Sequence, residues 1–296
     1  MNIFILKLFT RGTNEHDAGA QDYCFENNLA SIGWGLKEEN LDGDESPETL
    51  LKMTYDKYQN DSNFKTSSNN LSKMKPGDFV WTQYNDARDF RLGKIKYDKC
   101  FVDTNKLIIG LSRHCEWHTV DFNDVPGEII NSYQRKSRTL IMKHNLDNFQ
   151  EYFEYLYDPQ STLNKKLDYQ QLFHYDDLED LLGLYLQVEE NYYILPSTNK
   201  TSTKLIEYEL RKKEKDGTIK KACVQCKTGD AVVDDTIFEI EDFNDYHIYI
   251  STMKNDNYDP KGTNVTTIHT DKLWAWAKEH RDLLPGRINK YIDICK

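Results

Sequence analysis

The chain lacks an excess of positive charge, and it has no long apolar segment. Its 296 residues carry 38 Lys and Arg against 49 Asp and Glu, which gives a net charge of −11. This balance argues against a protein that coats nucleic acid through bulk electrostatic attraction. No apolar run approaches the length of a membrane span, and no signal peptide is recognisable. We therefore expect a cytoplasmic protein without a membrane partner.

The six cysteines are scattered, and they lack the pair-of-pairs spacing of a structural zinc site. Cys223 and Cys226 form a single C-x-x-C, and no second C-x-x-C or close histidine pair accompanies it. Both cysteines are therefore expected to be strand residues with reduced thiols. The composition, with 38% hydrophobic residues, is that of a soluble globular protein, and the length allows two domains.

The most informative part of the chain is a Gln-x-Lys pair, Gln225 and Lys227, preceded by Glu207 and Glu209. The run around Gln225 is apolar and β-prone, so strand alternation sends Gln225 and Lys227 to one face. Phosphodiester hydrolysis needs a divalent cation and a positive charge near the phosphate. Carboxylate, amide and carbonyl oxygens are the ligands that Mg²⁺ prefers. The pattern therefore favours a metal-dependent nuclease site.

The same residues also have an ordinary structural explanation. A Gln and a Lys two positions apart are common on a solvated strand face, and Glu-x-Glu is usually the polar side of an antiparallel strand. However, Gln225 and Lys227 lie in a run that is otherwise apolar on both faces. Polar groups there are costly unless they meet partners or a metal, which favours the functional interpretation.

In this order of residues the chain resembles the PD-(D/E)XK nuclease superfamily, in the variant that has glutamine at the second acidic position. The resemblance covers about residues 165–296 and implies a restriction-endonuclease-like α/β sandwich. It implies catalytic roles for Glu179 on a helix, Glu207 on a strand, and Gln225 and Lys227 on the next strand.

The resemblance also implies a cofactor, Mg²⁺ or Mn²⁺. Its ligands would be Glu207, Gln225 and the backbone carbonyl of Cys226, close to Glu179. The first acid is a glutamate here, where aspartate is commoner in the family, and Glu209 competes with Glu207 for that role. The sequence leaves this choice open.

The N-terminal half reads as short strands punctuated by glycine, which favours a small β-barrel. It resembles the PUA-like superfamily, which includes the EVE, YTH and SRA base readers, through Ile32-Gly-Trp34-Gly, Lys75 to Trp81, Gly93-Lys-Ile and Val125 to Tyr133. The resemblance covers about residues 1–145. It implies a domain that holds a flipped base between aromatic rings. The candidate base-binding residues are Trp34, Trp81 and Tyr84, with Asp86 or Ser112 at the base edge. A tryptophan in a small barrel is also commonly a core residue.

Two basic clusters could meet phosphates despite the negative net charge. One contains Arg135, Lys136 and Arg138, and the other runs from Arg211 to Lys221 on an expected hairpin beside the candidate site. A charged hairpin tip is often simply solvated.

The break at Asp158-Pro divides the chain into a modified-base-reading domain, 1–157, and a nuclease domain, 158–296. The expected class is a two-domain α+β and α/β protein. In the first domain we expect strands at 2–9, 30–35, 74–82, 90–96 and 115–120, and helices at about 18–28, 46–72 and 145–157. In the second we expect helices at about 175–190 and 271–291, and strands near 191–196, 203–211, 221–227 and 245–252.

Together the halves suggest a modification-dependent DNA endonuclease for restriction or antiviral defence, with DNA that carries modified bases as its partner. The alternatives are a non-catalytic nucleic-acid reader with a degenerate nuclease fold, and an RNA-directed nuclease. Two cuts in a duplex need two active sites, which is compatible with a homodimer.

Overall fold

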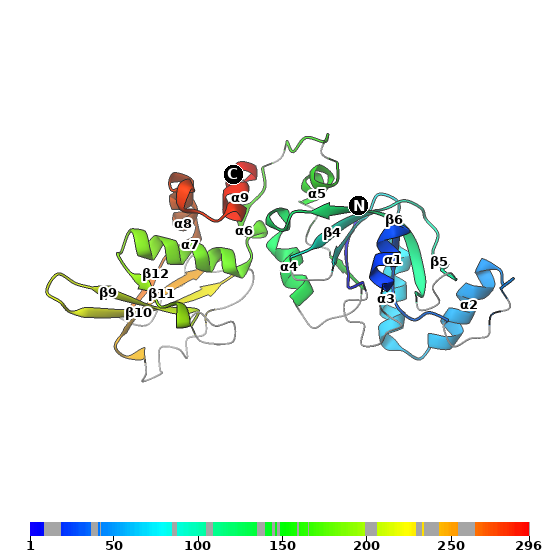
Figure 1. Ribbon diagram of the computed structural model, residues 1–296, viewed down its shortest axis with the longest axis horizontal. Helices are drawn as coiled ribbons and strands as arrows, with labels where there is room; N and C mark the ends of the chain where they lie inside the picture. The colour runs from blue at the N-terminus through cyan, green and yellow to red at the C-terminus, as the bar shows by residue number, and fades with distance from the viewer. Residues whose placement is uncertain are drawn as a thin grey trace. The chain divides into compact units, whose positions relative to one another are not determined.

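The structure is a computed structural model. It describes residues 1–8, 19–36, 41, 43–84, 88–104, 109–134, 140–143, 146, 149–158, 160–164, 166–198, 206–228, 233, 243–253 and 264–295. The chain divides into two compact units, residues 1–125 with 129–167 (unit 1), and residues 126–128 with 168–296 (unit 2). The division falls after Leu167, where the sequence suggested Tyr157. Both units are mixed α/β structures (Figure 1).

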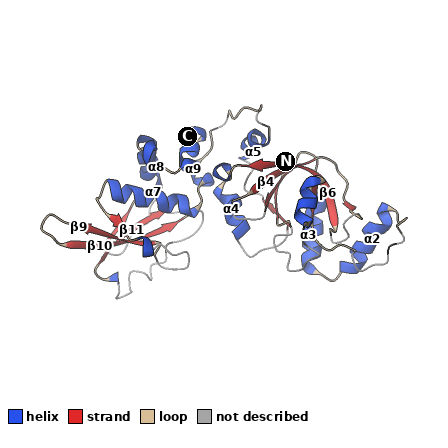
Figure 2. Cartoon of the chain, viewed as in Figure 1, coloured by secondary structure: helices blue, strands red, loops and turns tan. Residues whose placement is uncertain are grey.

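Unit 1 is built on a mixed sheet that curls into a half barrel (Figure 2). The strand order is β2-β6-β4-β3-β1-β7, and β5 pairs with β6. Strand β1 runs parallel to β3, and the other described pairings in this sheet are antiparallel. The strands are β1 (Ile3–Leu6), β2 (Leu29–Ser31), β3 (Phe79–Gln83), β4 (Phe90–Ile95), β5 (Phe101–Val102), β6 (Leu111–Val120) and β7 (Leu140–Lys143).

The helical stretch expected over 46–72 is two helices. Helix α2 (Pro47–Tyr58) begins where the Ser46 hydroxyl accepts a hydrogen bond from the Thr49 amide, as the sequence indicates. A new helix, α3 (Ser62–Lys73), begins after Asp61, because the Asp61 carboxylate accepts hydrogen bonds from the backbone amides of Asn63 and Phe64. The remaining helical segments of this region are α1 (Ala20–Glu26), η1 (Phe122–Asp124), α4 (Gly127–Gln134) and α5 (Gln150–Tyr157).

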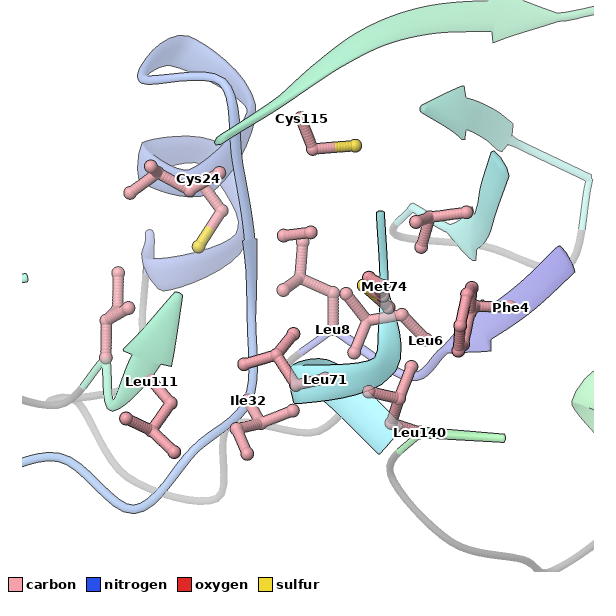
Figure 3. Close-up of a cluster of buried hydrophobic side chains, with 14 of the residues drawn as sticks. Phe4, Leu6, Leu8, Cys24, Ile32, Leu71, Met74, Leu111, Cys115 and Leu140 are labelled. Carbon is pink, nitrogen blue, oxygen red and sulfur yellow. The ribbon is translucent and has the colours of Figure 1, made fainter. Parts of the chain in front are cut away.

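A cluster of fully buried apolar side chains joins the curled sheet to its helices (Figure 3). Burying each leucine-sized side chain contributes about 1.5–3 kcal/mol, so this cluster is a main source of the stability of unit 1. Its members come from all seven strands of the sheet, from α1, α2 and α3, and from adjoining loop positions. Those labelled in Figure 3 are Phe4, Leu6, Leu8, Cys24, Ile32, Leu71, Met74, Leu111, Cys115 and Leu140.

Unit 2 contains a second sheet, of order β12-β11-β10-β9-β8. Strands β10, β11 and β12 run parallel to one another, whereas β8, β9 and β10 pair in antiparallel fashion. The strands are β8 (Tyr193–Ile194), β9 (Tyr208–Lys213), β10 (Ile219–Lys227), β11 (Tyr246–Thr252) and β12 (Val265–Thr267). The helical segments are α6 (Tyr169–Leu172), α7 (Tyr175–Val188), η3 (Pro196–Thr198), α8 (Thr270–Glu279), η6 (Arg281–Leu283) and α9 (Gly286–Ile294).

A buried ion pair fastens α9 to the first turn of α7. The Arg287 Nε lies 3.4 Å from the Asp177 Oδ2, and the two side chains are only 7% and 8% exposed. The same Nε donates a hydrogen bond of 2.6 Å to the Tyr291 hydroxyl. Asp177 also accepts a hydrogen bond from the amide of His174, which caps α7. The start of α7 is therefore held from two sides.

Within the described part of the chain, the helices are too short or too polar to cross a membrane. The six cysteines are free thiols, five of them buried.

Candidate functional site

Helix α7 carries Glu179, and its close approach to the sheet sets the position of this residue. The side chains of Leu178, Leu181, Leu182 and Leu186 on this helix are fully buried. A Cβ atom at Gly183 would lie 2.8 Å from the Tyr208 hydroxyl, so only glycine permits the observed packing against β9. The Tyr208 hydroxyl donates a hydrogen bond of 2.9 Å to the carbonyl of Glu179. The N-terminal half of α7 is thus fixed beside the start of β9.

Glu207 lies in a bend immediately before β9, where the sequence predicted a strand residue. Its amide donates a hydrogen bond of 2.8 Å to the carbonyl of Val224, so the bend stays attached to β10. The preceding residues 203–205 of the expected strand lie outside the described residues.

Lys227 is the last residue of β10, and its side chain points to Glu207. The Lys227 Nζ lies 3.5 Å from the Glu207 Oε1, and the two side chains are 22% and 21% exposed. A pair that is mostly shielded from water interacts more strongly than a surface pair. The structure therefore brings together two of the residues that the sequence singled out.

Electrostatics place Glu179 in the same group. Burial, together with the negative charges of Glu207, Asp176 and Asp180, raises the pKa of the Glu179 carboxyl to about 8, while Lys227 acts in the opposite direction. A like charge shifts a carboxyl pKa in this way only over a short range. Glu179, Glu207 and Lys227 are therefore one cluster, called here the carboxylate–lysine cluster.

Gln225 and Cys226 precede Lys227 at the end of β10. Gln225 is fully buried and pairs in register with Ile250 of β11. Burial raises the pKa of the Cys226 thiol well above its ordinary value, and the charges of Glu179 and Glu207 add to the shift. The Cys226 side chain is thus close to both carboxylates, although its thiol is not the expected donor.

The donor set can be tested against a divalent cation. Within the described residues, no group of three or more His, Cys, Asp and Glu side chains is placed to hold a metal ion. The set expected from the sequence has only two carboxylates, Glu179 and Glu207, and completes its ligands with an amide and a backbone carbonyl. All of these donors are oxygens. Burial and the charge of Glu207 raise the pKa of the Glu179 carboxyl, and a bound cation would favour the charged form of that carboxyl. The residues fit Mg²⁺ or Mn²⁺ in chemistry.

Glu209, the alternative first acid, belongs to a different set of contacts. Its Oε2 accepts hydrogen bonds of 2.7 Å from the Arg211 guanidinium and 2.9 Å from the Tyr246 hydroxyl. The geometry therefore associates Glu207, and not Glu209, with Lys227. Arg211 lies two positions from Glu209 on the same strand, whereas the partner Tyr246 has no local sequence signal, because it comes from β11.

In unit 1 two of the candidate base-binding residues are enclosed. Trp81 is fully buried, pairs with Ile5 in the sheet and packs edge-on against Phe153 at 5.3 Å between ring centroids. Ser112 is fully buried too, and its hydroxyl lies 2.7 Å from that of Ser31. In this conformation the Trp81 ring offers no face for a base, and the Ser112 hydroxyl is already in a buried hydrogen bond.

Trp34 and Tyr84 are half-buried. Trp34 has a left-handed backbone, with φ of 71°, and its indole N–H donates a hydrogen bond of 2.8 Å to Asp61. The Tyr84 hydroxyl donates to Asp22, and the Arg91 guanidinium lies 5.0 Å from the Tyr84 ring centroid. The other candidates, Asp86, Arg135, Lys136 and Arg138, lie outside the described residues.

Tyr84 is one member of an aromatic cluster that the sequence did not reveal. The Phe25 ring packs edge-on against Tyr84 at 5.0 Å and against Trp117 at 5.5 Å, and Arg91 lies over the Phe25 ring at 5.4 Å. These residues come from α1, β4 and β6 and the segment after β3, so no spacing in the sequence could have linked them.

The comparisons with known proteins give one match. A family model described as a domain of unknown function (DUF8426) matches residues 8–151, which lie mostly in unit 1. Neither the curated proteins nor the solved structures include a match to the chain.

Proposed function

We propose that this protein is a metal-dependent phosphodiesterase that cleaves DNA, with the carboxylate–lysine cluster as its active site. The observation that carries the proposal is the meeting of Glu179, Glu207 and Lys227 from α7, the bend before β9 and the end of β10. Hydrolysis of a phosphodiester requires acidic ligands and a nearby positive charge in one place, and this cluster supplies both.

In this proposal, each residue of the cluster has a role that follows from its charge. A bound Mg²⁺ or Mn²⁺ would supply Lewis-acid polarisation of the phosphate and acidification of a water molecule. Glu179 and Glu207 supply carboxylate ligands, with Gln225 and the Cys226 carbonyl completing the set. Lys227, held 3.5 Å from Glu207, offsets negative charge on the reacting phosphate and orients the water.

The order of elements supports the resemblance to the PD-(D/E)XK superfamily. A helix with a glutamate, α7, precedes the acid at the start of β9 and the Gln-x-Lys pair on β10, and helices accompany a mixed sheet. In the same way, the curled half barrel of unit 1 supports the PUA-like resemblance. In this proposal unit 1 selects DNA that carries a modified base, and unit 2 cleaves it.

Cleavage assays of the full-length protein test the proposal. The substrates are duplexes with ordinary, methylated, hydroxymethylated or glucosylated cytosines, and a matched RNA, each in Mg²⁺ buffer with and without EDTA. We expect the wild-type protein to cleave one of the modified DNAs. EDTA should abolish this cleavage, and the Glu207→Gln variant should not show it. Cleavage of RNA alone would identify an RNA-directed nuclease. Binding of a modified duplex without any cleavage would identify a non-catalytic reader, and activity in EDTA would overturn the metal-dependent site.

A further inference from the structure

The β9–β10 hairpin is a concentrated source of positive charge in an acidic chain. Residues 211–221 contain six cations and two acids, so the segment has a net charge of +4 (six minus two), whereas the whole chain has −11. The cations, called here the basic ribbon, are Arg211, Lys212, Lys213, Lys215, Lys220 and Lys221.

The register places like charges directly opposite each other. Lys212 pairs with Lys220, and Arg211 pairs with Lys221, in the antiparallel ladder of β9 and β10. Like charges opposite each other destabilise a hairpin. An acid accompanies each pair: the Glu214 Oε1 lies 2.8 Å from Lys220 and 3.7 Å from Lys212, and the Glu209 Oε2 lies 2.7 Å from Arg211. The segment 211–221 nevertheless keeps its excess of cations, which the pairing of the two strands does not require and which points to a role outside the hairpin.

The ribbon is also accessible. Four of its lysines are exposed. Within residues 211–221, Arg211 also pairs with Tyr193 of β8 and Lys221 with Tyr246 of β11, and the other described strand pairings of this segment join β9 to β10. Two large apolar side chains accompany the cations, with Tyr193 69% exposed and Ile219 53% exposed. Lysines can also serve only to prevent a sheet edge from pairing with another strand. That role does not require positive charges directly opposite each other, so it does not explain the ribbon.

Strand β10 links the ribbon to the candidate active site. Lys221 and Lys227 are six residues apart on this strand, so alternation gives them the same face, and a rise of about 3.3 Å per residue separates them by about 20 Å. Each nucleotide step of one strand of a duplex advances about 3.4 Å along the helix axis. The distance therefore corresponds to roughly six nucleotides.

We propose that the basic ribbon binds the phosphate backbone of the nucleic-acid substrate, about six nucleotides from the phosphate at Lys227. The position relative to cleavage rests on the function proposed above, whereas the binding itself does not. Because lysines contact phosphates without reading bases, the ribbon adds affinity equally for modified and unmodified DNA.

The test is equilibrium binding of a fluorescein-labelled, unmodified DNA duplex to the full-length protein in EDTA, measured between about 50 and about 200 mM salt. The variant is Lys213→Gln with Lys221→Gln. The matched control is Lys272→Gln with Lys278→Gln, two exposed lysines of α8. The loss of two phosphate contacts should make the slope of log affinity against log salt less negative by about 1.8, and should lower the affinity at 0.1 M salt by roughly 60-fold. The control should match the wild type.

The two proposals fail in different ways. Wild-type slope and affinity in the ribbon variant would overturn the ribbon proposal, even if Mg²⁺-dependent cleavage is observed. Absence of cleavage with a ribbon-dependent salt slope would overturn the nuclease and leave the binding surface standing. Replacing the same lysines by arginine keeps the charge and should preserve binding. A loss of binding in the arginine variant would show that the charge of these side chains does not explain the binding, which would overturn the proposal. Binding of acidic peptides that is ribbon-dependent, without DNA binding, would assign the surface to an acidic protein partner and overturn the proposal as well.

Discussion

The Lys227 ammonium lies 3.5 Å from a carboxylate oxygen of Glu207, 20 positions away along the chain. The pair joins the end of β10 to the bend that precedes β9, at the point where α7 brings in Glu179. A lysine that is paired with one carboxylate and affects the pKa of a second carboxyl brings opposite charges together, and most of what we expect of this protein depends on this cluster.

Removal of either member of the pair should abolish cleavage. We expect Glu207→Gln and Lys227→Ala each to reduce the rate by at least about 10²-fold, because each removes a charge that acts on the reacting phosphate. Single-turnover cleavage with excess enzyme measures the effect, and circular dichroism checks the fold. Glu209→Gln is the matched control, since Glu209 contacts Arg211 and Tyr246. An inactive Glu209→Gln beside an active Glu207→Gln would show that the acid has been assigned to the wrong residue.

The raised pKa of Glu179 should make stability depend on pH in the absence of metal. The pKa is about 8 in the folded protein against an ordinary value of 4.5, so the folded state holds a proton that the unfolded state releases. The free energy of unfolding should therefore fall as the pH rises from about 4.5 to about 8. Glu179→Gln should lose this component. Urea unfolding in EDTA at several pH values measures the difference, and equal pH profiles of the two proteins would contradict the prediction.

The oxygen donors of the cluster should select the metal. Mg²⁺ and Mn²⁺ should support cleavage and Zn²⁺ should not, because carboxylate, amide and carbonyl ligands suit the harder cations. Titration calorimetry should show binding of Mn²⁺ to the wild type and much weaker binding to Glu207→Gln. Equal Mn²⁺ binding by both proteins would place the cation elsewhere.

The buried pair of Asp177 and Arg287 should be essential for unit 2. Arg287→Met leaves the Asp177 carboxyl buried without its cation, and we expect a loss of about 3–5 kcal/mol in the free energy of unfolding. Adding Asp177→Asn to that variant should recover part of the loss, because the neutral amide keeps the shape of the side chain and removes the isolated charge. Additive losses in the double variant, measured by urea unfolding, would show that the two residues do not interact.

The two tryptophans of unit 1 should behave differently. Trp81→Ala opens a cavity in the core and should cost about 3–5 kcal/mol. Trp34→Ala should have a smaller effect on stability, because Trp34 is only half-buried, and should remove the preference for a modified duplex if the ring stacks on a base. Thermal unfolding and competition binding measure the two effects. A full preference in the folded Trp34→Ala variant would exclude this ring from recognition.

Several features of the fold could be predicted from the sequence, because local physical chemistry decides them. The Ser46 cap begins α2, and Pro285-Gly286 marks the break between the last two helices. The apolar run around Gln225 forms β10. The helix of Glu179 and the strand of Lys227 follow from periodicity, and the resemblance to the nuclease superfamily named the residues that meet.

Other features depend on contacts between distant segments. Glu207 and Glu209 are equivalent in a strand pattern, and only the bend at Glu207 and the partner Tyr246 distinguish them. Trp34 and Trp81 are likewise the same residue type, yet Phe153 encloses only Trp81. The sequence by itself determined the start of α2, the helix of Glu179, strand β10 and which charges are present. Tertiary structure decided which side chains are buried and which charges meet, because burial and ion pairing depend on residues that are far apart in the chain.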